Sequence, residues 1–381
     1  MNFDLSEEHK LIRQTVRDFA EREVKPLAQE LDEKGQFSVE LTKKMGELGL
    51  FGMYLPEKFG GQGLDTISYI IAVEELARVD SSQAATLAAH NSLGIGPIYY
   101  FGTQEQKEKY LPKLSTGEHL WAFGLTEPDA GSDSRGTKTT AKLENGEWLI
   151  NGSKIFITNG ASELAMGAAV QTVAKTEGRE RKFTTILVDK GTKGYSTVPM
   201  HGKMMWRASD TAELYFDDCR VPQENILGKE GQGSKIMLST LDNGRLSIAA
   251  MGLGLAQGAL EMAIQYSKER KQFGREINKF QAISFRLADM ATKVELGRNL
   301  LYKACWLKDN KKPFGKEAAM SKLYCSEIAK QVADDAVQIH GGYGLMKDYP
   351  IERFYRDQRL LQIGEGTSEI QRLVIAREIL K

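Results

Sequence analysis

Apolar side chains in the first third of the chain recur every three to four positions, which is the period of an amphipathic helix. The first such run comprises Ile12, Val16, Phe19, Ala20, Val24 and Leu27. Similar patterns cover residues 38–53 and 68–79, and Asp4 followed by Glu7 predicts a capped helix start. We therefore expect residues 1–119 to form an N-terminal α-helical domain.

From about residue 120 the pattern changes to short runs of β-branched and aromatic residues separated by turn residues. Asn-Gly pairs begin at positions 145, 151 and 159 with β-rich runs between them, which is typical of β-hairpins. Further strand candidates are residues 182–190, 195–200 and 211–222. The pattern predicts a small, barrel-like β-domain over residues 120–228.

Beyond residue 228 the helical period returns and continues through long segments without proline. We expect residues 229–381 to form a four-helix bundle, which makes the chain an α+β protein of three domains. The glycines of residues 252–258 lie inside this helical pattern and not after a strand, so they predict close helix packing and not a dinucleotide-binding turn. In residues 228–235, Ser234 precedes Lys235, which places the lysine out of register for a phosphate-binding loop.

Composition and charge exclude several classes of protein. Lys+Arg and Asp+Glu number 51 each among the 381 residues, so the net charge favours neither nucleic acid nor an anionic membrane as a partner. Cys219, Cys305 and Cys325 are too widely spaced for a disulfide framework or a structural zinc site. The sequence also lacks HExxH and GxSxG motifs and any cluster of histidines, so we expect no metal.

The N-terminal sequence is acidic and soon becomes amphipathic, unlike a secretory signal or an Arg-rich transit peptide. No run of about 18 apolar residues stands out as a membrane span. We expect a protein without membrane insertion that is cytoplasmic, or located in the mitochondrial matrix if a transit peptide has been removed.

The segment QIGEGTSEIQR, residues 362–372, places a carboxylate on a loop. Ser368 and Gln371 have the spacing of a capping box, which predicts a helix that begins just after Ser368. Glu369 then lies in the first turn, where the helix dipole favours a negative charge. Glu365 precedes the cap between two glycines, so its backbone can approach a ligand closely; its other interpretation is a flexible surface acid.

Several blocks in a fixed order resemble the acyl-CoA dehydrogenase family over essentially the whole chain. They are LTEPDAGSD (125–133), KIFITNG (154–160), RASDTAELYFDDCRVP (207–222), LDNGR (241–245), RKQFG (270–274), QIHGGYG (338–344) and EGTSEIQ (365–371). The resemblance implies an FAD-containing oxidoreductase of fatty acid metabolism, as in β-oxidation. Such an enzyme removes the α and β hydrogens of an acyl-CoA thioester and forms a trans-2-enoyl-CoA, with flavin N5 accepting the β-hydride.

The resemblance makes Glu365 the catalytic base, which takes the α-proton of the thioester. Some family members carry the base on a helix of the C-terminal bundle, but the matching position here is Gly244. We expect the pKa of Glu365 to rise when the acyl chain expels water from the site. The backbone N–H of Glu365 is expected to polarise the thioester carbonyl together with a ribityl hydroxyl of FAD.

The resemblance also assigns residues to the cofactor and to the substrate. Thr126 and Thr158 hydrogen-bond the flavin ring, and Phe156, where tryptophan is common in the family, packs on its face. The remaining residues expected at the flavin end of FAD are Phe123, Leu125, Ser132, Ile157, Thr367 and Glu369. The residues expected to contact CoA are Ser132, Asp242, Arg245 and Gly366.

A further set matches positions that hold the adenosine diphosphate part of FAD bound to a neighbouring subunit. An arginine suits the pyrophosphate because its planar donors stay charged. The resemblance therefore implies a homotetramer, a dimer of dimers. The set comprises Arg270, Phe273, Phe280, Gln281, Gln338, Gly341 and Gly342.

Residues 91–102 and LDNGR are more similar to short-chain, butyryl-type members than to long-chain members. Gly364 departs from the family, in which tyrosine often precedes the base, and the missing ring either admits a bulkier, branched or longer acyl group or is replaced by another side chain. The expected substrate is a short- to medium-chain acyl-CoA, and the expected electron acceptor is electron-transfer flavoprotein. The alternatives are an acyl-CoA oxidase or nitroalkane-oxidising relative, a dehydrogenase for branched or dicarboxylic acyl-CoA, and a helical scaffold protein that has lost its flavin.

Overall fold

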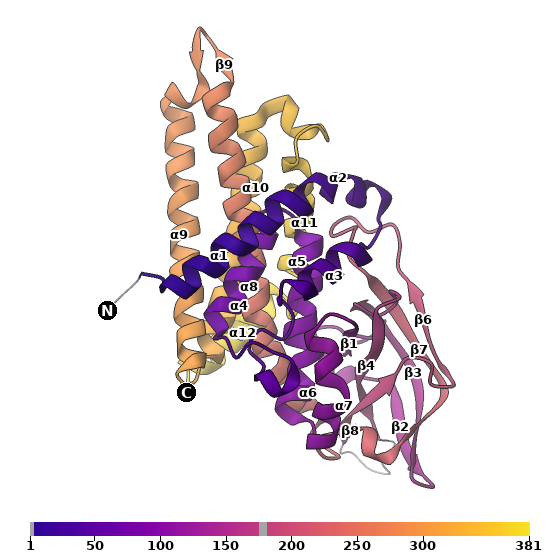
Figure 1. The fold of residues 1–381 in the computed structure, drawn as a ribbon. Helices are drawn as coiled ribbons and strands as arrows, with labels where there is room; N and C mark the ends of the chain where they lie inside the picture. Colours follow the sequence, from indigo (N-terminus) through magenta and orange to yellow (C-terminus); the bar gives the residue numbers. More distant parts are fainter. Residues whose placement is uncertain (1–3, 175–180) are drawn as a thin grey trace.

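The computed structural model describes residues 4–174 and 181–381, and it consists of helices beside one large mixed sheet (Figure 1). The described residues before position 120 form helices and loops without a strand, as the sequence predicts. A π-helical segment, Ala20–Val24, joins the first two helices, and another, His90–Ile95, joins α5 to α6. The helices of this region are α1 (Glu7–Phe19), α2 (Lys25–Lys34), α3 (Val39–Glu47), α4 (Thr66–Ala77), α5 (Ser81–Ala89), α6 (Gly96–Phe101) and α7 (Gln104–Ser115).

The apolar stripe predicted for the first helices faces the core, and Val16, Phe19 and Val24 are buried. The predicted cap is wrong by two residues. Ser6 is the N-cap, and its hydroxyl accepts a hydrogen bond from the backbone N–H of His9 at 3.2 Å. Ser6 occupies this position because a serine oxygen reaches the third N–H of the helix as well as an aspartate does.

The middle of the chain forms an eight-stranded sheet. Its order is β6-β7-β3-β2-β4-β5-β8, with β1 paired in parallel to β4. In the described residues the sheet has two ends, β6 and β8, and is not closed into a barrel by strand pairing. The strands are β1 (Leu120–Gly124), β2 (Thr140–Glu144), β3 (Glu147–Thr158), β4 (Ala165–Val173), β5 (Phe183–Asp189), β6 (Tyr195–Pro199), β7 (Thr211–Pro222) and β8 (Ile226–Leu227).

Only the first Asn-Gly pair forms a hairpin turn. Asn145 and Gly146 join β2 to β3, and both have positive φ angles (53° and 81°), as a type I′ turn requires. The second pair lies inside β3 where the register with β7 shifts, which corrects the prediction of a turn there. A side chain at Gly152 would put its Cβ 2.6 Å from Oγ1 of Thr139, so this glycine permits close strand approach.

The C-terminal part is a bundle in which α8 (Gly233–Glu269), α9 (Gln281–Asp309) and α10 (Gly315–His340) lie side by side (Figure 1). The shorter helices α11 (Ile351–Leu361) and α12 (Ser368–Ile379) pack on α10. The two-residue strands β9 (Lys271–Gln272) and β10 (Arg275–Glu276) form a hairpin at the end of α8.

The glycines inside α8 confirm the prediction of close helix packing. A Cβ at Gly254 would lie 2.1 Å from the carbonyl oxygen of Glu74, and one at Gly258 would lie 2.1 Å from that of Arg78. On another side of α8, Gly252 would meet the carbonyl oxygen of Cys325 at 2.7 Å. Helix α8 therefore contacts both α4 and α10 at backbone distance.

Within the described residues, α8 is also the one helix long and apolar enough to cross a membrane, with a mean hydropathy of 1.3 over an 18-residue window. The helix meets this test by length and composition only, since polar and charged residues interrupt its apolar positions. In the structure 78% of that window is buried inside the fold, so its apolar surface is used in packing.

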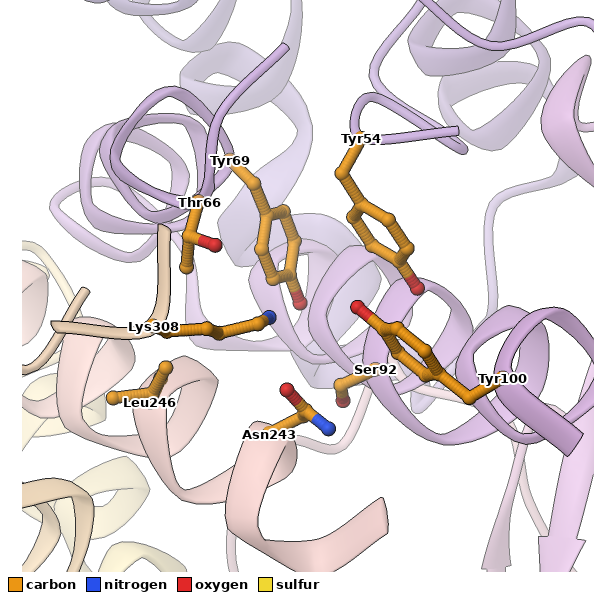
Figure 2. Close-up of a pocket in the computed structure, with 8 residues that line it drawn as sticks. All are labelled: Tyr54, Thr66, Tyr69, Ser92, Tyr100, Asn243, Leu246 and Lys308. Atoms are coloured by element: carbon orange, nitrogen blue, oxygen red, sulfur yellow. The ribbon is translucent and has the colours of Figure 1, made fainter. Parts of the chain in front are cut away.

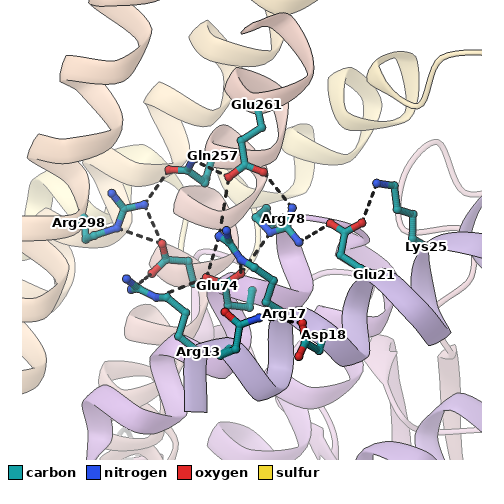
Figure 3. A network of polar contacts seen from close by, with 12 residues as sticks. Arg13, Arg17, Asp18, Glu21, Lys25, Glu74, Arg78, Gln257, Glu261 and Arg298 are labelled. Carbon is teal, nitrogen blue, oxygen red and sulfur yellow. Dashed lines mark hydrogen bonds and ion pairs between the residues drawn. The ribbon is translucent and has the colours of Figure 1, made fainter. Parts of the chain in front are cut away.

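A network of ion pairs joins α1, α4, α8 and α9 (Figure 3). Glu74 and Glu75 on α4 are almost fully buried at its centre. Glu74 accepts hydrogen bonds from Arg298 of α9 (Nη2, 2.8 Å), and Glu75 accepts from Arg17 of α1 (Nε, 2.8 Å). Because each buried carboxylate is paired, the network fixes the N-terminal helices against the bundle.

Candidate active site

A cavity of about 430 Å³ lies between the helices and the sheet. Side chains of α5, β1, β3 and α8 and the loop before α12 line it, and most of this lining is apolar. A concave, largely apolar cavity with a few polar groups is the usual form of a small-molecule site. We therefore expect the site residues predicted from the sequence to line this cavity.

The loop that carries Glu365 ends at a helix cap, but the cap differs from the prediction. Thr367, and not Ser368, is the N-cap of α12, and its hydroxyl accepts from the backbone N–H of Ile370. Helix α12 begins at Ser368, one residue before the predicted start. The amide of Gln371 bonds the carbonyl of Gly366 at 2.9 Å instead of closing a capping box.

Glu365 borders the cavity in an unusual backbone conformation, with a φ of 52°. The residue as a whole is partly buried, but its Oε2 oxygen is shut off from solvent and has no hydrogen-bond partner among the described residues. Burial raises the pKa of Glu365 to about 7, against the opposing positive charges of Lys322 and Arg245. A carboxyl group with these properties can exchange a proton near neutral pH.

Gly244 on α8 faces the carboxylate of Glu365. A Cβ added at Gly244 would lie 1.8 Å from Oε2 of Glu365, which no native packing permits. The two positions that the sequence analysis compared for a base thus meet at one point in space, and the glycine leaves room for the carboxylate.

Lys322 of α10 is a charged residue that the sequence analysis missed. It is completely buried, and its Nζ donates a hydrogen bond to the carbonyl oxygen of Gly366 at 2.7 Å. In the sequence it resembles any lysine on an amphipathic helix, and only the packing of α10 against the Glu365 loop distinguishes it.

Most of the residues expected at the flavin line the cavity. The ring of Phe156 is 63% exposed at its border, and Phe156 has a φ of 61°. An exposed aromatic ring beside an apolar cavity is a surface that a planar ligand can cover. The predicted cofactor residues that line the cavity are Phe123, Leu125, Thr126, Ser132, Phe156, Ile157, Thr158 and Thr367.

The loop that carries Leu125 and Thr126 is anchored by a buried ion pair. Lys154 of β3 donates to Glu127 at 2.7 Å and to the carbonyl oxygen of Leu125 at 3.2 Å. Glu127 also accepts hydrogen bonds from the backbone N–H of Thr139 at 3.0 Å. Since both partners are buried and satisfied, the pair holds this loop rigidly at the cavity.

The residues expected to contact CoA are only partly brought together. Ser132, Arg245 and Gly366 line the cavity, and Nε of Arg245 is buried without a hydrogen-bond partner among the described residues. Asp242 is not a lining residue but pairs with Nη1 of Arg245 at 2.5 Å. Glu369 is exposed in the first turn of α12 and does not line the cavity.

A second hollow, of about 540 Å³, lies at the other end of α8. Arg270, Gly341 and Gly342 line it, whereas Phe273, Phe280, Gln281 and Gln338 do not. Phe273, in the turn between β9 and β10, is 93% exposed and packs only edge-on against Phe280. Arg245 and Arg270 are about 37 Å apart along α8, so the two hollows of one chain are separate sites.

A third, small cavity of about 10 Å³ has Tyr54, Tyr69, Tyr100, Asn243 and Lys308 among its lining residues (Figure 2). Its volume suits about one water molecule. The hydroxyl of Tyr69 is within 3.0 Å of the carbonyl oxygen of Ala88, which neighbours the main cavity. Among the described residues, no three His, Cys, Asp or Glu side chains are arranged to hold a metal ion.

Comparison with known proteins assigns a family to each third of the chain. The family model for the acyl-CoA dehydrogenase N-terminal domain matches residues 6–118. The models for the middle domain and the C-terminal domain of the same family match residues 122–219 and 231–380.

Individual relatives match over the full length. The short-chain specific acyl-CoA dehydrogenase of Clostridium acetobutylicum is 48% identical, and the match covers 100% of both chains. The solved butyryl-CoA dehydrogenase of Megasphaera elsdenii is 44% identical with a TM-score of 0.97, over 100% of both chains. A chain in a structure described as the electron transferring flavoprotein of Acidaminococcus fermentans is 47% identical with a TM-score of 0.96, again over 100% of both.

Proposed function

The chain belongs to the acyl-CoA dehydrogenase family, and from that premise we propose that it oxidises a short- to medium-chain acyl-CoA to the trans-2-enoyl-CoA with FAD as cofactor. One observation carries the proposal. The Oε2 oxygen of Glu365 is buried at an apolar cavity without a hydrogen-bond partner among the described residues, and the pKa of Glu365 is raised to about 7. This is the state expected of a base that removes a weakly acidic proton.

In the proposed reaction Glu365 takes the α-proton of the acyl group, and its backbone N–H donates to the thioester carbonyl. The negative charge that develops on this oxygen is stabilised by the donor. The apolar lining of the cavity excludes water, which keeps the proton affinity of the carboxylate high. Arg245, whose Nε has no partner among the described residues, would hold a polar group of CoA.

The residues at the cavity fit a flavin. Phe156 presents an exposed ring, and Thr126 and Thr158 lie beside it as hydrogen-bonding groups. FAD, when bound, supplies the acceptor for the β-hydrogen, which leaves as hydride. Ser132 and Thr367 also line the cavity within reach of a bound ligand.

We infer that the second hollow serves the adenosine diphosphate part of a neighbour's FAD and that the chain forms a homotetramer. The separation of the two hollows within one chain supports this inference, as does the exposure of Phe273. One similar chain comes from a structure whose description names the electron transferring flavoprotein of Acidaminococcus fermentans. This supports electron-transfer flavoprotein as the acceptor. The bacterial relatives support a cytoplasmic location.

The acyl chain is proposed to be short, with room for a branch at Gly364. The short-chain relatives support the length. A Cβ at Gly364 would meet Leu360 at ordinary contact distances of 3.5 to 3.7 Å, so no neighbour fills this position closely. Ala85, Ala88 and Ala89 add further small side chains to the wall of the cavity.

The substitution Glu365→Gln tests the function. The variant is expected to fold and to keep its yellow FAD, but butyryl-CoA should no longer reduce the flavin, because an amide cannot accept the α-proton. Full turnover by this variant would overturn the proposal, and a wild-type protein purified without flavin absorbance would favour the scaffold alternative.

A panel of straight, branched and dicarboxylic acyl-CoA substrates with an artificial acceptor would then define the acyl group. The Gly364→Tyr variant tests the role of Gly364. The added ring should reduce turnover of branched substrates more than that of butyryl-CoA, which serves as the internal control. Peroxide formation in place of reduction of electron-transfer flavoprotein would indicate the oxidase alternative.

A further inference from the structure

The turn that carries Glu365 is conformationally strained. Glu365 has a φ of 52° and Gly366 a φ of 93°, so two consecutive residues lie in the left-handed region. A non-glycine residue adopts this region at a cost and keeps it only where surrounding contacts determine it. Contacts that hold this turn therefore also hold the carboxylate in the cavity.

Two buried side chains supply those contacts. Lys322 of α10 donates to the carbonyl oxygen of Gly366 at 2.7 Å, and Gln371 of α12 donates to the same oxygen at 2.9 Å. Gln371 also reaches the carbonyl oxygen of Glu365 at 3.3 Å. Both side chains are completely buried, so the two donors fix the turn from two different helices.

Burial of the charged Lys322 side chain costs free energy. Its hydrogen bond to Gly366 does not explain why a charged residue stands here, because a neutral donor could make the same bond. No carboxylate in the described residues lies within ion-pair distance of its Nζ. A glutamine would satisfy the Gly366 carbonyl without the expense of a buried ammonium group. The position of the charge next to the Glu365 turn suggests a second role.

We propose that Lys322 is a positioning residue for Glu365, which fixes the strained turn through the Gly366 carbonyl and favours the deprotonated carboxylate through its charge. The proposal rests on the proposed function of Glu365 as the base and adds the means by which that base is held and kept ionised.

Other charged and titratable groups also face the Glu365 carboxylate, and they do not replace Lys322. Arg245 of α8 is positive but is already paired with Asp242. Tyr69 of α4 is also near Glu365 and adds no positive charge. Glu327 of α10 and Glu369 of α12 act on Lys322 instead, and their negative charges favour its protonated form.

The directions of the pKa shifts agree with the geometry. Burial raises the pKa of Glu365, and the charge of Lys322 opposes that rise more than the charge of Arg245 does. Burial lowers the pKa of Lys322 to about 8, so its amine is still mostly protonated at neutral pH. Removal of this charge should therefore increase the proton affinity of Glu365.

Four variants of the holoenzyme separate charge from position. Lys322→Gln removes the charge and keeps a donor, and Lys322→Arg keeps the charge. Gln371→Leu removes both hydrogen bonds of Gln371 to the turn and leaves the charge in place. Lys330→Met, an exposed lysine on the same helix, is the control. The readout is exchange of the α-protons of a 3-thia-acyl-CoA with deuterated solvent, because this compound has no β-hydrogen and its exchange reports the base alone.

Lys322→Gln should move the acid limb of the exchange rate to higher pH by about one unit, with a loss of roughly fivefold at pH 7 that fades at higher pH. Lys322→Arg should restore the wild-type limb. Gln371→Leu should lower the rate at every pH without moving the limb, and Lys330→Met should change neither. Should Lys322→Gln fail to fold, Gln371→Leu still tests the hydrogen bonds that hold the turn. An acid limb displaced in Lys322→Arg would then overturn the role of the charge, because this variant keeps it.

An unchanged acid limb in folded Lys322→Gln would overturn the role of the charge. Full exchange in Gln371→Leu would overturn the role of the hydrogen bonds that hold the Glu365 turn. Failure of the underlying function has a different signature. In that case Glu365→Gln would still exchange the α-protons, whatever the result at Lys322.

Discussion

The protonation state of Glu365 should control the pH dependence of turnover. The proposed base would work as a carboxylate, and burial raises the pKa of Glu365 to about 7. We therefore expect kcat/KM to rise as the pH increases through about 7 and to level off above it, since the fraction of carboxylate follows the same curve. A pH profile with butyryl-CoA measures this, and a flat profile between about pH 6 and 8 would contradict it.

Gly244 should be intolerant of even the smallest side chain. The Cβ of Gly244→Ala would lie 1.8 Å from Oε2 of Glu365, so the carboxylate has to move. A displacement of about 1 Å at a reacting group can cost about 100-fold in rate, and we expect a loss of kcat of this order with FAD content unchanged. Lys235→Ala, exposed on the same helix, is the control, and equal kcat in the two variants would show that the carboxylate tolerates the shift.

The sequence predicts Glu365 as a residue of this site but does not predict Lys322. Glu365 stands out because it lies between two glycines and before a helix start, and the structure places it at the cavity. Lys322 has no such signal, because a buried and an exposed lysine look alike on an amphipathic helix. Its importance follows only from the packing of α10 against a turn 44 residues later in the chain.

The link between helices α4 and α9 depends on a buried carboxylate. Glu74 accepts a hydrogen bond from Arg298 (Nη2, 2.8 Å; Figure 3). It accepts another from the hydroxyl of Tyr302 (2.8 Å). Glu74→Gln leaves the guanidinium without its buried partner, and we expect a loss of stability of about 3 kcal/mol. Thermal unfolding measures it against Glu295→Gln, which removes the exposed partner of the same arginine (3.3 Å) and should cost less than about 1 kcal/mol.

Equal destabilisation by the two variants would show that burial of Glu74 adds nothing to the link. In that case the apolar contacts between the helices, and not the ion pair, would determine how firmly the N-terminal helices attach to the bundle.

Among the elements, the helices and several strands follow from the sequence, whereas β4 does not. β7 coincides with a predicted strand because its residues alternate between buried and exposed positions. β4 (AMGAAVQTV) has no alternation, since the strand is buried on both faces, and it is rich in alanine and glycine, which favour strands weakly. Its pairing with β1, β2 and β5 is a property of the whole sheet.

At the scale of the whole molecule, the proposed homotetramer would build one complete site from two chains. Glu365 and Phe156 border one hollow, and Arg270 borders the other, about 37 Å along α8. Closed symmetric oligomers bring such separate surfaces together through the same contact used twice. The proposed assembly therefore predicts that Arg270 serves the site of a neighbouring chain.

A mixed oligomer tests this prediction directly. Glu365→Gln alone lacks the base, and Arg270→Glu alone should hold FAD poorly, because a negative charge replaces the donor expected at the pyrophosphate. When the two variants are co-expressed, a mixed pair contains one site with both Glu365 and Arg270 intact. Random assortment should then restore about a quarter of wild-type activity.

Lys268→Glu, an exposed lysine near the same end of α8, should retain FAD in the control oligomer. If Arg270 served its own chain's site, every site of the mixed oligomer would carry one defect, and activity would stay at the level of the single variants.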